Sequence, residues 1–142
     1  YPSGKEFNFY SNPAATRAVV NNWPTRIIFN GFEVGNTVMT GRRVLTELSA
    51  NNPVRAAYAL YLGTETSRPS WDPVSVYTAI RGTDSLFKLA GQGGTNTINA
   101  YGGNSFDERF SDPRNNAYLV KKATDTVIAE KLEALMLQGP KL

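Results

Sequence analysis

The stretch TRIIFNGFEVG, residues 25–35, decides the fold class of this chain. Its apolar, partly β-branched run is closed by glycines, which is the pattern of a buried strand that enters a loop. Helical patterns stand on both sides of it, and helices that alternate with an apolar strand indicate an α/β protein. Glu33 stands at the predicted end of this strand, where α/β folds hold ligands, although a hydrogen bond to nearby backbone explains the residue equally well.

Helix signals surround this stretch. Residues 11–22 predict a helix with Ser11 or Asn12 as N-cap and Pro13 in its first turn. Residues 40–50 predict a short helix that ends at the Asn51-Asn52-Pro53 breaker. Three further helices are expected: an amphipathic one at 54–62 with Val54, Ala57, Tyr58, Tyr61 and Leu62 on one face; one from Asp72 as N-cap; and one at 124–137 that buries Val127, Ile128, Leu132, Leu135 and Met136.

Strand signals are fewer. Besides 25–29, the region 95–120 predicts a hairpin through YGGNSFDERFSDPRN, residues 101–115. Residues 5–10 alternate, so an extended segment would place Glu6 and Asn8 on one face, about 7 Å apart, with Phe7 and Phe9 anchored in the core. A parallel sheet needs more strands than these to bury both faces. We therefore expect the rest of the sheet on another chain or on a segment before Tyr1.

Composition limits the possible chemistry. With 142 residues, 41% hydrophobic and 19% charged, residues 1–142 predict one globular domain. The chain has no cysteine and no histidine, which excludes disulfides, thiolate metal sites and Ser-His or Cys-His catalysis within it. Its net charge is +3, and the basic residues are scattered along the sequence, so no nucleic-acid partner is expected. The sequence contains no apolar run of about 18 residues, so no membrane span is predicted.

The stretch RPSWDPVSVY, residues 68–77, places Trp71 beside Asp72 at a helix start. Asp before Pro is a common helix cap and Trp commonly packs in cores, so a structural interpretation of this pair stands beside a functional one.

Taken together, five stretches resemble the C-terminal part of the inosine-uridine nucleoside hydrolase family. The resemblance extends over nearly the whole chain, and a Glu-Phe-Asn motif followed at a distance by Trp-Asp-Pro is fairly specific. The stretches are EFNFYSNPAA (6–15), WPTRIIFNGFEVG (23–35), RPSWDPVSVYTAI (68–80), GTNTINAYGGNSF (94–106) and NNAYLVKK (115–122).

The resemblance implies hydrolysis of the N-glycosidic bond of ribonucleosides to free base and ribose, with one bound Ca²⁺. Asp72 matches a calcium ligand of the family, and Glu6 and Asn8 match the pair that binds ribose hydroxyls. Glu33 occupies a family acidic position and is expected to give support from behind these residues. Trp71 replaces a histidine that pyrimidine-accepting members carry, which favours purines because an indole can stack on a protonated purine.

The resemblance also implies a Rossmann-like open sheet with flanking helices and a C-terminal β-hairpin. The family's aspartate cluster lies near its N-terminus and is not in these residues. We therefore expect the N-terminal half of the same protein as partner, a homo-oligomer of the complete protein, and no hydrolysis by this chain alone. The compartment is not indicated, with the cytoplasm slightly favoured over secretion. Two alternatives remain: a non-catalytic nucleoside or sugar binder, and a structural or secreted interaction protein that keeps the fold.

Overall fold

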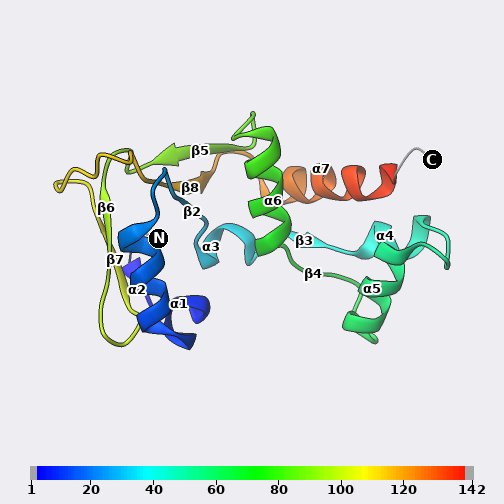
Figure 1. Cartoon of the computed structure of the whole chain (residues 1–142). Coiled ribbons are helices and arrows are strands. Elements are labelled where there is room, and N and C mark those ends of the chain that lie inside the picture. Colours follow the sequence, from blue (N-terminus) through cyan, green and yellow to red (C-terminus); the bar gives the residue numbers. More distant parts are fainter. Residues whose placement is uncertain (1–2, 140–142) are drawn as a thin grey trace. The chain divides into compact units, whose positions relative to one another are not determined.

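The computed structural model describes residues 3–139 (Figure 1). It is a mixed α/β protein with small open sheets and flanking helices, which confirms the predicted α/β class. Internal contacts divide the chain into two compact units. The first unit comprises Tyr1–Glu33 and Phe87–Val120, and the second unit comprises Val34–Leu86 and Lys121–Leu142. The single domain stays a prediction.

The first unit holds most of the strands. In one sheet the order is β2-β8-β5, formed by Ile28–Phe29, Ala117–Lys121 and Phe87–Ala90, with β2 parallel to β8. The predicted strand at 25–29 is therefore present but shorter. The second sheet is β1-β7-β6, formed by Ser3–Gly4, Asn104–Asp107 and Thr95–Ile98, all antiparallel.

The predicted hairpin is confirmed with different bounds. β6 and β7 pair directly, and the chain turns at residues 99–103, where Asn99 accepts hydrogen bonds from the backbone N–H groups of Tyr101 and Gly103. An Asn side chain that bonds nearby backbone in this way stabilises a tight turn. The hairpin does not continue to residue 115, because β8 joins the other sheet.

One helix of the first unit covers its apolar cluster. α2 (Pro13–Asn22) has Asn12 as its N-cap, and the Asn12 side chain accepts a hydrogen bond from the N–H of Ala15, as the sequence predicts. This helix packs against β6 (Figure 1). The apolar cluster beneath it consists of Val20, Phe29, Ile98 and Phe106, with Phe9, Ile27 and Tyr118 at its edge.

The predicted extended segment at 5–10 is wrong. β1 ends at Gly4, and α1 (Phe7–Ser11) follows, because the carbonyl of Glu6 accepts from the N–H groups of both Phe9 and Tyr10 at 3.0 Å. Glu6 and Asn8 therefore do not share one face of a strand. Phe7 is 65% exposed and is not a core anchor, whereas Phe9 is half-buried, with its ring 6.5 Å from that of Phe29.

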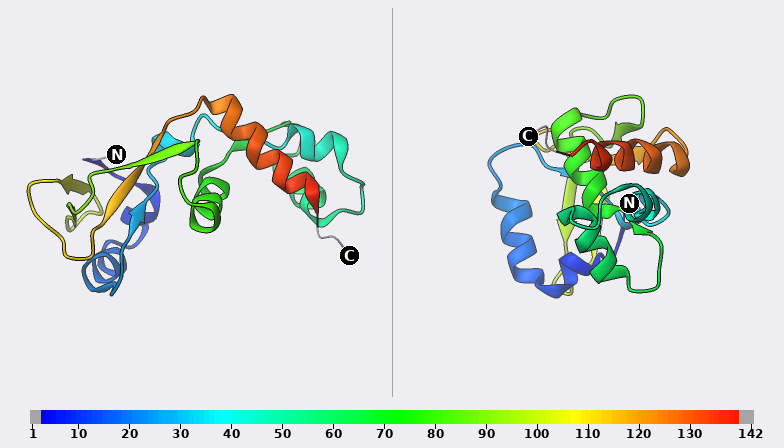
Figure 2. Two further views of the ribbon diagram at one scale, coloured as in Figure 1. Left: turned by 90° about the horizontal axis from the view of Figure 1, so that it is seen from above. Right: turned by 90° about the vertical axis from the view of Figure 1, so that its right-hand side faces the viewer.

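The second unit is mostly helical. Its helices are α4 (Arg42–Glu47), α5 (Pro53–Leu62), α6 (Trp71–Arg81) and α7 (Asp125–Gln138), beside the antiparallel pair β3 (Met39–Thr40) and β4 (Arg68–Pro69). Figure 2 shows α7, in orange to red, beside α4, which it contacts. α4 also contacts α5. The helices expected from the sequence are confirmed, each with ends shifted by a few residues.

Two predicted apolar faces differ from expectation. α5 has no buried residue, and Tyr61, on its predicted core face, is 69% exposed. In α7, Ile128 and Leu132 are buried as expected, but Val127 is 46% exposed. A stripe at helical spacing shows that a face is apolar; what covers it depends on the neighbouring elements.

A buried carboxylate holds the second unit together. Glu133 of α7 is 6% exposed, and its Oε1 accepts hydrogen bonds from the backbone N–H groups of Gly41 (2.8 Å) and Arg43 (3.1 Å) at the start of α4. These N–H groups have no partner within the helix, and the helix dipole favours an anion there. Within residues 3–139, no helix combines the length and apolarity that crossing a membrane requires.

Candidate functional site

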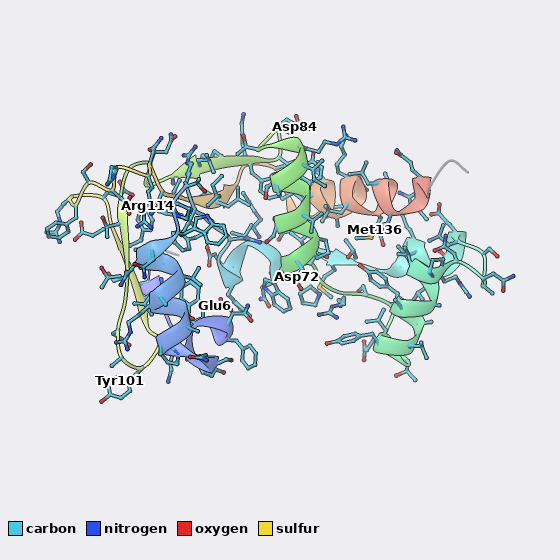
Figure 3. The ribbon with its side chains drawn as sticks, in the orientation of Figure 1. Glu6, Asp72, Asp84, Tyr101, Arg114 and Met136 are labelled. Atoms are coloured by element: carbon cyan, nitrogen blue, oxygen red, sulfur yellow. The ribbon has the colours of Figure 1, made fainter. Side chains whose placement is uncertain are left out.

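A hollow in the first unit gathers residues from three separate parts of the sequence. We call it the Glu6 hollow; its volume is about 370 Å³. Figure 3 labels Glu6, which is half-buried and directly precedes α1. The residues that line the hollow are Ser3, Gly4, Lys5, Glu6, Phe7, Tyr10, Phe32, Glu33 and Asn104.

Glu33 belongs to this hollow and not to a loop behind it. It lies in the first turn of the short helix α3 (Phe32–Gly35), where the sequence predicts a strand end. The structure thus brings Glu6 and Glu33 to one cavity, although 26 residues separate them in the sequence. Burial, together with the carboxylates of Glu108 and Glu33, raises the pKa of the Tyr118 phenol, so the charge of Glu33 also acts on the neighbouring sheet.

Asn8 does not line the Glu6 hollow. It is exposed on α1, since the helical turn after Glu6 directs positions 6 and 8 differently from a strand. Asn104, at the start of β7, supplies an amide to the hollow instead and is 7% exposed. Sequence reasoning missed Asn104, although it lies in the stretch 94–106 that carries the family resemblance.

The lining of the Glu6 hollow suits a hydroxylated ring. Two carboxylates accept hydrogen bonds, Asn104 can donate or accept, and aromatic rings of Phe7, Tyr10 and Phe32 offer apolar surface. The Lys5 ammonium lies 5.1 Å from the centre of the Tyr10 ring, within the range of a cation–π contact. Small ligands bind in concave sites with this mixture of apolar walls and a few polar groups.

Trp71 and Asp72 lie in the second unit, at the start of α6. The prediction that Asp72 is the N-cap of this helix is wrong. Ser70 takes that position, and Asp72 is an exposed residue of the first turn. The helix begins earlier because the carbonyl of Ser70 already accepts the N–H of Val74. An acidic residue in the first turn is favoured by the helix dipole.

Trp71 is half-buried and tightly seated against Gly35. A Cβ at Gly35 would lie 2.6 Å from the Cα of Trp71 and 2.8 Å from Cδ1 of its ring. The N–H of Ser70 also donates to the carbonyl of Gly35. The glycine therefore allows the start of α6 to approach this backbone closely, and any larger residue would displace Trp71.

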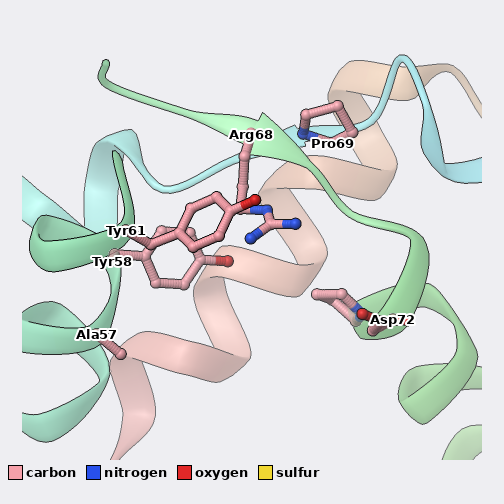
Figure 4. A pocket seen from close by; sticks show the side chains of 7 residues that line it. Ala57, Tyr58, Tyr61, Arg68, Pro69 and Asp72 are labelled. Carbon is pink, nitrogen blue, oxygen red and sulfur yellow. The ribbon is translucent and has the colours of Figure 1, made fainter. Parts of the chain in front are cut away.

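A second hollow, of about 290 Å³, contains Asp72 but not Trp71 (Figure 4). The Arg68 guanidinium lies over the Tyr61 ring, 3.9 Å from its centre, and Asp72 lies across the opening from this pair. Sequence reasoning assigned Tyr58, Tyr61 and Arg68 no functional role. We call this second hollow the Tyr61 hollow. The residues that line it are Ala57, Tyr58, Tyr61, Arg68, Pro69, Asp72 and Pro73.

Buried hydroxyls fix the wall of the Tyr61 hollow. Thr40 and Ser70 are both fully buried and their oxygens are 2.6 Å apart, while Thr40 also lies 3.0 Å from the Tyr58 hydroxyl. These contacts join β3, the start of α6 and α5. Buried hydroxyls require such partners, so the network positions Asp72 through the adjacent Ser70.

Asp72 does not belong to a cluster of acidic side chains in the described part of the chain. In the range 3–139 no three Asp, Glu, His or Cys side chains lie close enough together to hold a metal ion. Calcium takes six to eight oxygen ligands, of which Asp72 would supply one or two. Its role as a calcium ligand therefore stays a prediction that depends on ligands from elsewhere.

Comparison of the chain with protein-family models, curated proteins and solved structures found no match. The geometry thus joins Glu6 and Glu33 in one cavity and places Asp72 in another, while Asn8 and Trp71 line neither.

Proposed function

We propose that this chain is the C-terminal, sugar-binding part of a nucleoside hydrolase that cleaves purine ribonucleosides to base and ribose. The observation that carries the proposal is the Glu6 hollow. Two acidic residues that the family resemblance singles out independently, Glu6 and Glu33, line one cavity together with three aromatic rings. The proposal includes a nucleoside hydrolase-like, Rossmann-like sheet completed by an N-terminal half that supplies further strands.

Glu6 has a direct part in this chemistry. Its carboxylate accepts hydrogen bonds from ribose hydroxyls and so orients the sugar. The aromatic rings of the hollow lie against the apolar face of the ribose. As the glycosidic bond breaks, positive charge develops on the sugar, and a nearby carboxylate stabilises that charge more than it stabilises the neutral substrate. Binding in the hollow therefore contributes to the rate as well as to the affinity.

Trp71 and Asp72 keep the roles that the resemblance implies. Trp71 stacks on the purine, and a protonated base gains from an indole face by about 1 to 2 kcal/mol in a dry pocket. Asp72 supplies oxygen to a calcium ion whose other ligands come from outside these 142 residues. Among residues 3–139, no group of three Asp, Glu, His or Cys side chains lies together at Asp72 to complete such a site. Asn8, which is exposed outside the hollow, contacts ribose only if the bound state reorders α1.

Ribose release from inosine by the product of the complete gene tests this proposal. We expect release of reducing sugar, loss of that activity with a calcium chelator, and a 10- to 100-fold lower kcat/KM for Glu6→Gln, as expected for roughly 1.5 to 3 kcal/mol from a charged hydrogen bond. Glu108→Gln is the matched control, since Glu108 is an exposed glutamate of the same unit outside the hollow. Nucleoside binding without turnover would support the non-catalytic alternative. If the protein neither binds the nucleoside nor releases ribose, the hydrolase proposal and the non-catalytic alternative are both refuted.

A further inference from the structure

A glycine lies directly against the carboxylate of Glu33. A Cβ built on Gly31 would lie 2.6 Å from Oε2 and 2.8 Å from Oε1 of Glu33, and the next nearest atom is Cδ of the same side chain at 3.0 Å. Real Cβ atoms essentially never come within 3.0 Å of another atom, so any side chain at this position would displace the carboxylate.

The backbone itself does not require glycine at this position. Gly31 is not among the glycines with positive φ, so its φ angle does not call for glycine. Gly31 is itself buried, but the three atoms nearest to a new Cβ all belong to the carboxyl group of Glu33, which is the far end of a flexible side chain. The cost of a methyl group here therefore falls on the position of Glu33 and not on the core.

We propose that Gly31 positions the Glu33 carboxylate at the wall of the Glu6 hollow, so that Glu33 binds the sugar directly as a second hydroxyl acceptor. This inference rests on the proposed function and changes the role expected for Glu33, from support behind the site to contact with the ligand. Two carboxylates on one cavity can accept hydrogen bonds from different hydroxyls of one ring. The ligand class is thus a polyhydroxylated ring, with each acid holding its own hydroxyl.

Titration of the intact protein with D-ribose, which is not consumed, tests the inference by NMR. We expect Glu33→Gln and Gly31→Ala each to weaken ribose binding by about 10- to 100-fold, the range for one hydrogen bond to a charged group. In a Glu33→Ala background, Gly31→Ala should have no further effect, because the carboxylate that it displaces is gone. Thermal unfolding midpoints should stay within a few degrees of the wild type for all variants.

The outcomes separate the two proposals. If Glu6→Gln weakens ribose binding while Gly31→Ala and Glu33→Gln bind like the wild type, Glu33 is not a ligand contact and this inference is wrong, whereas the proposed function stands. If Gly31→Ala weakens binding equally with and without Glu33, the glycine does not act through that carboxylate and the inference is also wrong. If the folded wild type binds neither ribose nor inosine, the proposed function fails and this inference fails with it.

Discussion

Glu133 and Glu6 show two opposite uses of a glutamate in one chain. Glu133 is 6% exposed and accepts two backbone N–H groups at the start of α4, so its hydrogen bonds are made within the protein. Glu6 is half-buried and borders a hollow with a second carboxylate and aromatic rings. The first arrangement stabilises a fold, and the second is accessible to a ligand. Burial and partners, not residue type, separate the two roles.

The largest expected effect on stability is at Glu133. Replacing it by alanine leaves the N–H groups of Gly41 and Arg43 without an acceptor in a buried place, which we expect to lower the free energy of unfolding by about 2 to 4 kcal/mol. Urea denaturation of the two proteins measures the difference. Glu6→Ala is the matched comparison and should change stability by less than about 1 kcal/mol. Equal losses at both positions would break the distinction between the two glutamates.

Asp112 is a second carboxylate that stabilises the fold, and its contribution depends on pH. Its carboxylate pairs with Arg114 at 2.5 Å and accepts from the amide of Asn116, and the Arg114 guanidinium holds the pKa of this carboxyl below its ordinary value. Arg114 also donates to the carbonyls of Val20 and Trp23 at the end of α2.

Because the pKa of Asp112 is lower in the folded state, its contribution is fully present above the unfolded pKa of about 4 and is lost as pH falls below it. Denaturant unfolding between pH 7 and pH 2 should show this loss, about 1 to 2 kcal/mol in all, and Asp112→Asn should be less stable at pH 7 but less sensitive to acid. A variant whose stability falls with acid as steeply as the wild type would exclude Asp112 as the source.

The smallest effect distinguishes two neighbouring phenylalanines. Phe9 is half-buried at the core cluster, whereas Phe7 is 65% exposed at the rim of the Glu6 hollow. Phe9→Ala should cost about 1 to 2 kcal/mol, less than the 3 to 5 kcal/mol of a fully buried ring, and Phe7→Ala less than about 0.5 kcal/mol. Phe7→Ala should instead weaken sugar binding. A larger loss of stability at Phe7 than at Phe9 would restore the anchor role that the sequence predicted for Phe7.

Local signals explain which parts of the fold were predictable. The helix start at Asn12 followed from an amide cap before proline, a pattern that is complete within four residues. Asn52, which the sequence analysis treated only as part of a helix breaker, caps α5 in the same way. The prediction of an extended segment at 5–10 was wrong, because alternating Phe and polar residues fit a strand locally. The helical turn that follows Glu6 depends on contacts with the rest of the unit, which the local sequence does not show.

The candidate site was predictable only in part. Glu6 and Glu33 were singled out, but no local pattern shows that residues 27 positions apart share a cavity, and the helical turn removed Asn8 from it. Asn104 lies in a stretch that carries the family resemblance and could have been considered there. Glu133 gave no signal at all, because an acidic residue in a helix looks like an ordinary solvated one until its partner on α4 is known.

The most direct test of the central claim is an NMR titration of the intact protein with D-ribose. We expect the amide signals of residues that line the Glu6 hollow, such as Glu6, Glu33 and Asn104, to shift, those around Glu133 to stay in place, and Glu6→Gln to remove the shifts. Shifts confined to other surfaces, or an unchanged response in Glu6→Gln, would contradict the assignment of this hollow as the sugar site.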